Sequence, residues 1–453
     1  MTLGTLYYGV FILACAVTFK LVSETVPEPF IDEIFHLRQC QTYCAYKFNE
    51  WDNKITTPPG LYLLGFVYSK IISLFFVHSN SLVDVCGNSN VLRSVNLFGG
   101  AIVLALILNG LSPANFEKRN YYIANVISSP LLYTYYFLFY TDVWASILVI
   151  LALYLVVKRP IGNLVSIFIS ALVSFISLWF RQTNILWVIF VVVVLIDQRK
   201  KTKNEGLTLT TCKDFLLQAF KDIVMVAPFA LVTVAFAGFV VYNGGVTLGD
   251  KENHKFNLHV VQVFYCFSFI TFFTVPVWLS VQTLKRYLKF TLGSALKVAF
   301  TVLSFVGIKY IVDNFTIVHP FLLADNRHYT FYIWRKILRV KYSWICLVPV
   351  YHFSTWTVVS NLLSNKSSLK LEPISIIAFI GCTCITIIPS PLFEPRYYIL
   401  PLLIFRIFTS PKSEKHLSFE FAWNMLINLV TVTIFINFEF PWDTETFPQR
   451  IIW

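Results

Sequence analysis

Apolar stretches long enough to cross a membrane, or nearly so, follow one another along almost the whole chain. They lie near residues 3–22, 60–77, 91–111, 121–140, 143–157, 161–180, 184–197, 222–242, 259–281, 295–313, 343–362, 373–390, 397–410 and 419–437. A membrane-spanning helix needs about 20 residues, and several of these stretches are shorter, so we expect about 12–14 spans. Only 13% of the residues are charged, against about 25% in a soluble protein. The sequence therefore predicts an all-α polytopic membrane protein, with one integral membrane domain over residues 1–453.

The net charge of +12 does not indicate a protein that binds nucleic acid. The basic residues, Lys203 and Lys412 among them, cluster in short loops between the apolar stretches. This pattern is typical of membrane proteins, in which positive loops stay in the cytosol. We therefore place in the cytosol the loops at 112–120, 158–160, 198–221, 284–290 and 411–416.

The remaining loops then fall on the non-cytosolic side, and they carry all of the unusual polar motifs. They include a first loop at 23–59, a loop at 319–342 and a C-terminal tail at 438–453. The topology rests on basic clusters alone, so this coincidence predicts one composite site at the non-cytosolic mouth of the bundle. One segment does not fit the alternation of sides. Either 60–77 re-enters or lies at the interface instead of crossing, or the count of spans is wrong nearby.

The nine cysteines do not predict a disulfide framework, because most of them lie inside apolar stretches. Cys40 and Cys44 are one helical turn apart in the first loop. We favour free thiols over a bridge between them, since a disulfide requires a specific approach of the two Cα and Cβ atoms. The apolar stretch at 3–22 has no basic region before it and no cleavage site, so we expect a retained anchor.

Two adjacent carboxylates, Asp32 and Glu33, follow the first apolar stretch. Neighbouring residues do not share a face, so at most one of them points into a given cleft. A carboxylate beside a membrane cavity is a suitable general base for a hydroxyl group. The alternative is structural: the pair could cap a helix over Ile34–Tyr46 and complement its dipole.

Several cationic side chains in the same set of loops could bind a phosphate. Arg396 lies at the mouth of an apolar stretch, where an arginine is a functional candidate and can make bidentate phosphate contacts. Arg327 and His328 belong to the densest polar run outside the first loop. The further candidates are His319 and Arg181. Each candidate has a structural alternative. Arg396 could form an ion pair with a neighbouring glutamate or extend its charge toward the membrane surface. Arg327 and His328 could belong to an interfacial loop of mixed charge, and Arg181 to a tight polar turn.

Other signals are weak or absent. Asp142 and Asp250 are candidates for substrate binding, with capping of a loop as the alternative for each. His328 is not accompanied by a metal-binding pattern, so no metal is expected. The sequence has no phosphate-binding glycine loop and no dinucleotide fingerprint. A sugar donor would therefore be a lipid, or would reach its site through the membrane.

The polar motifs, taken in order, resemble the eukaryotic family of dolichyl-phosphate-glucose-dependent α-1,2-glucosyltransferases. The motifs are Asp32-Glu33-Ile34-Phe35-His36, Trp51-Asp52, Lys54-Ile55-Thr56-Thr57-Pro58-Pro59-Gly60-Leu61-Tyr62, Tyr140-Thr141-Asp142, Phe180-Arg181-Gln182-Thr183-Asn184, Gly249-Asp250-Lys251, His319-Pro320, Ala324-Asp325-Asn326-Arg327-His328-Tyr329 and Glu394-Pro395-Arg396-Tyr397. The motifs of the first loop and the run after Leu323 are the ones most specific to this family.

The resemblance implies a multi-pass enzyme of the endoplasmic reticulum membrane with the GT-C architecture and an active site on the luminal face. It would move glucose from dolichyl-phosphate-β-glucose to Glc2Man9GlcNAc2-PP-dolichol by a single inverting displacement, the last step in assembling the lipid-linked oligosaccharide for N-glycosylation. No cofactor is implied, and the partners are these two lipids and the surrounding membrane lipids.

The resemblance also implies roles for individual residues. Asp32 would be the general base, with Glu33 as the alternative. Arg396, Arg327 and His328, then His319 and Arg181, would bind the donor phosphate. The sugars would be contacted by Trp51, Asp52, Tyr62, Asp142 and Asp250.

Two other functions remain open from the residues alone. A transporter or flippase also has many spans with polar residues inside, but it usually binds its substrate near the middle of the membrane and often contains repeats. A non-catalytic partner of another membrane protein is the third possibility.

Overall fold

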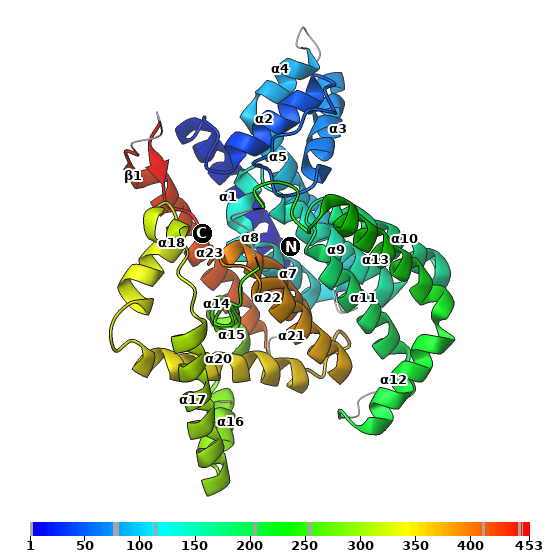
Figure 1. The fold of residues 1–453 in the computed structure, drawn as a ribbon, viewed down its shortest axis with the longest axis vertical. Coiled ribbons are helices and arrows are strands. Elements are labelled where there is room, and N and C mark those ends of the chain that lie inside the picture. The colour runs from blue at the N-terminus through cyan, green and yellow to red at the C-terminus, as the bar shows by residue number, and fades with distance from the viewer. Residues whose placement is uncertain are drawn as a thin grey trace.

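The structure, a computed structural model, describes residues 3–75, 81–112, 116–202, 206–251, 256–409, 413–442, 445 and 447–453. Lys203 and Lys412 lie outside these residues. The described chain is almost entirely helical (Figure 1), which confirms the predicted all-α class. Its two short strands, β1 (Glu439–Phe440) and β2 (Gln449–Arg450), pair antiparallel near the C-terminus.

The first half of the chain forms a bundle around α9. The helix α5 continues into α6 through a π-helical turn at Gly99–Val103, so the three segments act as one long helix. The elements are α1 (Leu3–Thr25), α5 (Ser89–Phe98), α6 (Leu104–Leu111), α7 (Phe116–Ile127), α8 (Pro130–Thr134), α9 (Asp142–Lys158), α10 (Asn163–Leu178) and α11 (Asn184–Arg199). They share one large apolar core with the second half.

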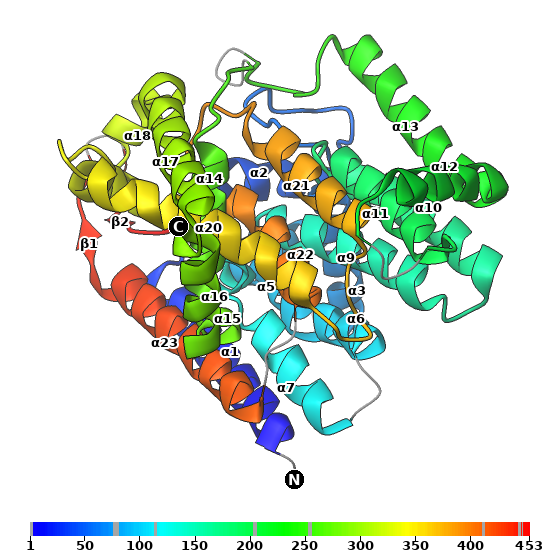
Figure 2. The same ribbon diagram turned by 90° about the horizontal axis from the view of Figure 1, so that it is seen from below.

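The second half adds further long helices and short interfacial ones (Figure 2). The elements are α12 (Leu209–Lys221), α13 (Ile223–Asn243), α14 (Gln262–Phe273), α15 (Val275–Trp278), α16 (Val281–Leu292), α17 (Ala295–Phe315), α18 (Pro320–Ala324), α19 (Tyr329–Ile333), α20 (Trp344–Ser364), α21 (Pro373–Ile387), α22 (Ile399–Ile407) and α23 (Glu414–Asn437). The packed pairs α11 with α21 and α7 with α23 join the two halves.

Among the residues that the structure describes, five helices are by themselves long and apolar enough to cross a membrane: α1, the helix from Ser89 to Leu111, α13, α17 and α23. Of these, α13 and α17 are the least covered by other helices. Because their exposed side chains are mostly apolar, these surfaces suit lipid contact. The protein is therefore a polytopic membrane protein, while the count of about 12–14 spans stays a prediction.

The helices between α1 and α5 form a separate helical layer. It consists of α2 (Glu33–Cys44), α3 (Gly60–Phe75) and α4 (Leu82–Gly87), which pack on one another (Figure 1) around their own apolar cluster. We call these three helices the cap layer. The helix predicted over Ile34–Tyr46 is thus confirmed within two residues at each end.

The described part of the segment at 60–77, helix α3, packs in the cap layer and does not cross the bundle. The Oγ atom of Ser89, at the start of α5, donates a hydrogen bond of 3.1 Å to the carbonyl of Pro27, just after α1. The chain therefore leaves and re-enters the bundle on the same side. The polar α2 is too short to span, so α3 has no partner for a return crossing and lies on that side, as one of the two alternatives required.

The expectation of free thiols is wrong for one pair. Cys44 forms a disulfide with Cys86 in α4, with the Cα atoms 6.5 Å apart. Cys40 is free and buried, as expected. The short α4 folds back onto the end of α2, and this packing brings together two cysteines that are 42 residues apart.

Candidate active site

A cavity of about 810 Å³ opens where the cap layer meets the main bundle. Its wall is built from nine stretches of the chain that are far apart in the sequence. They are residues 31–36, 54–57, 135–141, 181–183, 246–250, 321–330, 392–397, 442 and 452–453. The structure thus brings the polar motifs of the non-cytosolic loops into one site.

Asp32 faces this cavity because the chain turns sharply just before it. Ile31 has a φ angle of +52°, a left-handed conformation that is costly for a β-branched residue. Asp32 occupies the N-cap position of α2, but its side chain makes no capping hydrogen bond. Its backbone N–H donates to the hydroxyl oxygen of Tyr140 at 3.1 Å. The carboxylate is left free to reach into the cavity, where it contacts Arg396.

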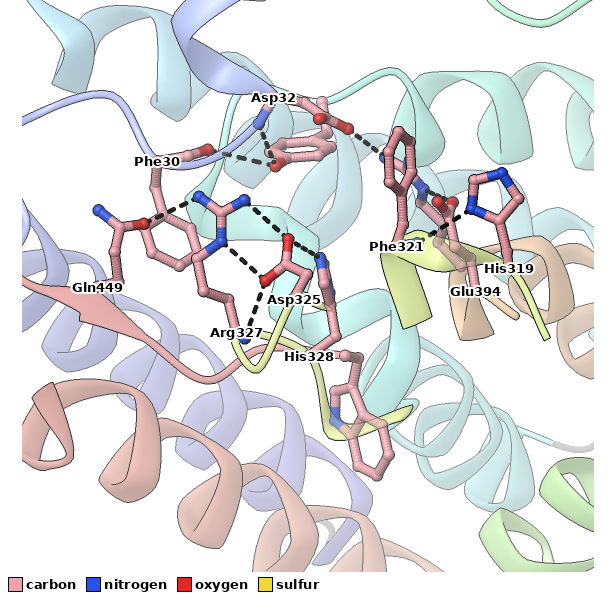
Figure 3. Close-up of polar contacts among 12 residues, drawn as sticks. Phe30, Asp32, His319, Phe321, Asp325, Arg327, His328, Glu394 and Gln449 are labelled. Carbon is pink, nitrogen blue, oxygen red and sulfur yellow. Dashed lines mark hydrogen bonds and ion pairs between the residues drawn. The ribbon is translucent and has the colours of Figure 1, made fainter. Parts of the chain in front are cut away.

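The contact with Arg396 sets the charge of Asp32 (Figure 3). Arg396 Nη1 donates to Asp32 Oδ2 at 2.7 Å, and Arg396 Nε donates to Glu394 at 2.5 Å. Burial raises the pKa of Asp32, but the charge and hydrogen bond of Arg396, with contributions from His36 and His328, together outweigh burial and leave that pKa lowered. Burial lowers the pKa of the neighbouring His36 to about 4, although the charge of Asp32 opposes this. His36 is therefore neutral at pH 7, and Arg396 is the cation that keeps Asp32 ionised.

Glu33 points away from the cavity, into the junction of the cap layer with the bundle. Its side chain is completely buried and forms a bidentate ion pair with Arg93, through Nε at 3.0 Å and Nη2 at 2.7 Å. It also accepts hydrogen bonds from the backbone N–H groups of Phe30, at 3.0 Å, and Phe139, at 2.6 Å. Both oxygens are thus fully engaged, so Glu33 does not stand as the alternative base.

Arg327, Asp325 and His328 form a second polar cluster on the cavity wall (Figure 3). Two Arg327 nitrogens donate to Asp325, Nε at 2.9 Å and Nη2 at 2.7 Å, and His328 Nε2 lies 3.8 Å from the same carboxylate. Burial opposes the ionised form of Asp325, but the hydrogen bonds from Arg327 dominate and lower its pKa. The cluster is half-buried and faces the cavity beside Arg396.

Arg181 lines the cavity, and its charge is paired with a carboxylate behind the cavity wall. Its Nη2 atom lies 2.8 Å from the carboxylate of Asp142, which is buried at the start of α9. The guanidinium also lies over the Tyr397 ring, 5.6 Å from its centroid. Asp142 therefore supports Arg181 from behind the cavity wall, and its role as a substrate ligand stays a prediction.

Three other predicted residues do not reach the cavity. Tyr62 is completely buried, with its hydroxyl 2.8 Å from His36 Nδ1. Trp51 packs against the Tyr62 ring, and Asp52 accepts a hydrogen bond from the Lys54 backbone. They stabilise the first loop instead of flanking a sugar, because the loop folds inward around Tyr62.

Of the two remaining candidates, Asp250 lines the cavity and His319 does not. His319 is the N-cap residue of α18 and accepts a hydrogen bond from Phe321 N–H at 3.2 Å; it stands next to the cavity wall but not on it. Asp250 does line the cavity. Its loop is held against the first loop at Gly249, where a side chain would meet the Asn53 carbonyl oxygen at 2.2 Å.

Sequence reasoning missed Lys54. The cavity is lined by four cations, Lys54, Arg181, Arg327 and Arg396, and by four acids, Asp32, Asp250, Asp325 and Glu394. The three arginines each have an acidic partner. Within the described ranges, Lys54 has no acidic partner and lies over the Phe35 ring, 5.5 Å from its centroid. Its only signal in the sequence was its place at the start of the motif Lys54–Tyr62.

Sequence reasoning also missed the C-terminal tail. Trp442, Ile452 and Trp453 line the cavity, but the sequence predicted only the side on which the tail at 438–453 lies and no role for its residues. No pattern in the tail itself signals this return to the site.

The fold and the cavity define a polytopic membrane protein with an enzyme-like site of paired acids and arginines. The model of the DIE2/ALG10 family matches residues 26–407, and the chain belongs to this family. No solved structure matches the chain.

Relatives are similar over almost their full length, and each of three is named Dol-P-Glc:Glc(2)Man(9)GlcNAc(2)-PP-Dol alpha-1,2-glucosyltransferase. The protein of Debaryomyces hansenii is 53% identical, covering 98% of both chains. That of Candida albicans is 43% identical, covering 96% of this chain and 95% of its own. The Homo sapiens protein is 34% identical, covering 98% and 97%.

Proposed function

We propose that the chain is an inverting α-1,2-glucosyltransferase that uses dolichyl-phosphate-glucose as donor and Glc2Man9GlcNAc2-PP-dolichol as acceptor. The observation that carries this proposal is the placement of Asp32, the one carboxylate of its pair that faces a cavity also lined by Arg396 and Arg327. The full-length similarity to relatives with this name supports the choice of substrates.

In the proposed reaction, the 2-hydroxyl oxygen of the acceptor's terminal glucose attacks the anomeric carbon of the donor glucose. The bond from that carbon to the phosphate oxygen breaks, and dolichyl phosphate leaves with the bonding electrons. Asp32 takes the hydroxyl proton as the new bond forms. The linkage changes from β to α because attack and departure occur on opposite faces of the sugar.

Arg396 couples binding of the donor phosphate to the basicity of Asp32. In the free protein its charge is shared between Asp32 and Glu394, so a donor phosphate competes with them for the guanidinium. When the phosphate takes part of that charge, the pKa of Asp32 rises, since burial is then less opposed. Asp32 becomes a stronger base only when the donor is in place, while the arginines stabilise the charge of the leaving phosphate.

The proposed location is the endoplasmic reticulum membrane, with the cavity open to the lumen. The disulfide between Cys44 and Cys86 supports this orientation, because disulfides persist in oxidising compartments such as the lumen. Both cysteines belong to the cap layer, which borders the cavity. Within the described part of the chain, no group of three or more His, Cys, Asp or Glu side chains could hold a metal ion.

The test is glucosyl transfer by the purified protein with dolichyl-phosphate-glucose and a di-glucosylated lipid acceptor. We expect a product with one added glucose in an α-1,2 linkage. A transporter would move the donor across a vesicle membrane without forming this product. No transfer, under conditions in which a relative is active, would exclude the enzyme.

A further inference from the structure

The C-terminal tail, residues 439–453, lies beyond the residues that the family model matches, 26–407, yet it forms part of the cavity wall. The tail leaves α23, pairs as β1 and β2, and ends beside the polar loop at 325–329. The question is whether this stretch only covers the site or holds a part of it in place.

Arg450 anchors the tail to the bundle. Its side chain is 5% exposed. One nitrogen, Nη1, donates to the carbonyls of Phe435, at 3.0 Å, and Ile436 at the end of α23. The other, Nη2, donates to the carbonyl of Thr25 at the end of α1, at 3.2 Å, and to Glu439 at 2.9 Å. The tail is therefore fixed to the two helix ends that border the cap layer.

Beyond this anchor, the tail pairs with the backbone of the polar loop. Ile452 N–H donates to the carbonyl of Arg327, and Tyr329 N–H donates to the carbonyl of Ile452, both at 2.8 Å. The Trp453 ring packs on Tyr329 with 4.4 Å between centroids. The Trp453 carbonyl accepts a hydrogen bond of 2.9 Å from the hydroxyl of Tyr135, which also lines the cavity. These contacts fix the backbone on both sides of His328.

The tail also holds the Arg327 side chain directly. Gln449 Oε1 accepts from Arg327 Nη1 at 3.2 Å (Figure 3), and the Trp442 ring lies 4.4 Å from the guanidinium carbon. Gln449 is 1% exposed. With Asp325 on the remaining edge, the guanidinium is held on three sides and cannot turn without breaking one of these contacts.

We propose that the described residues of the tail, 439–442, 445 and 447–453, are a positioning element for the donor site: Gln449 and Trp442 hold Arg327 in the orientation in which it receives the donor phosphate. This inference rests on the proposed function. The two residues do not touch the reacting atoms; they act through Arg327. Their loss should therefore weaken donor binding and leave acceptor binding unchanged.

The experiment compares Gln449→Met, which removes the acceptor of the Arg327 hydrogen bond, with Trp442→Leu, which removes the ring. Each should raise the donor KM roughly three- to tenfold, with the acceptor KM unchanged. Trp442→Phe, which keeps an aromatic face, should recover most of the loss. Phe438→Ala is the matched control, since Phe438 is an exposed residue at the base of the tail, and its donor KM should equal that of the wild type.

Thermal protection by dolichyl phosphate gives a second measurement that does not depend on transfer. The wild type should be protected at lower ligand concentrations than either variant. Unchanged donor KM and unchanged protection in a folded Gln449→Met protein would overturn the inference, as would an equal rise in the donor and acceptor KM. By contrast, a wild type that is protected but transfers no glucose would remove the proposed function and leave the positioning role standing.

Discussion

Replacing each of the adjacent carboxylates by its amide should have different effects: Asp32→Asn should lower kcat, and Glu33→Gln should lower stability. Glu33→Gln removes a buried charge that pairs with Arg93, and it places an amide N–H₂ group among the N–H donors of Arg93, Phe30 and Phe139. Breaking a fully buried ion pair costs about 3–5 kcal/mol, a large part of a typical stability of about 5–15 kcal/mol. Asp32→Asn, by contrast, acts on a side chain that is 36% exposed and leaves Arg396 paired with Glu394.

We therefore expect Asp32→Asn to unfold at the wild-type temperature in detergent but to lose roughly 10²–10⁴-fold in kcat. Glu33→Gln should unfold at a clearly lower temperature, and its folded fraction should retain a kcat close to that of the wild type. Glu50→Gln, an exposed acid in the same loop, is the control and should change neither quantity. An active Asp32→Asn protein, or a stable but inactive Glu33→Gln protein, would refute the assignment of base and structural acid.

Four further predictions follow from the site and the cap layer. Because Arg396 lowers the pKa of Asp32, the acid limb of kcat/KM should lie below the ordinary titration range of an aspartate. It should move to higher pH in Arg396→Gln, where burial is less opposed; an unmoved limb contradicts the pairing. Replacing Cys44 by Ser removes a loop closure worth about 4 kcal/mol, so it should lower the unfolding temperature, while exposed Cys212→Ser should not. Lys54→Met should raise the donor KM roughly two- to fivefold, and an unchanged KM excludes contact with the phosphate. Transfer should persist after treatment with EDTA, since no metal is expected; a loss restored by a divalent cation would contradict this.

The helical class and the gathering of polar loops could be predicted from the sequence, because both depend on local composition. Apolar length determines which segments enter the membrane, and basic loops determine the side on which they return. Once the sides are set, Asp32, Arg181, Asp250, Arg327 and Arg396 fall on one face without any knowledge of packing. The structure then places all five of these side chains on a single cavity.

The direction in which each side chain points could not be predicted. Asp32 and Glu33 have the same charge and adjacent positions, and what separates them is Arg93, which is 60 residues away and comes into contact only when α5 packs beside the end of α1. The link between Cys44 and Cys86 arises in the same way, from the packing of α4 on α2. Neither contact has a periodic or local signal in the chain.

The pairing of the cavity's arginines has a consequence for how a substrate can enter. Arg181, Arg327 and Arg396 are each neutralised by an acid before any ligand arrives. A donor phosphate therefore meets a nearly neutral wall and gains contact with Arg396 only by displacing a carboxylate. If that carboxylate is Asp32, binding of the donor itself frees the base at the moment when a sugar is present to react. If it is Glu394, Asp32 stays paired and weak. If the phosphate displaces Asp32, the acid limb of kcat should lie at higher pH than the acid limb of kcat/KM. If it displaces Glu394, the two limbs should coincide. Comparison of the two pH profiles therefore identifies the carboxylate that the donor phosphate displaces.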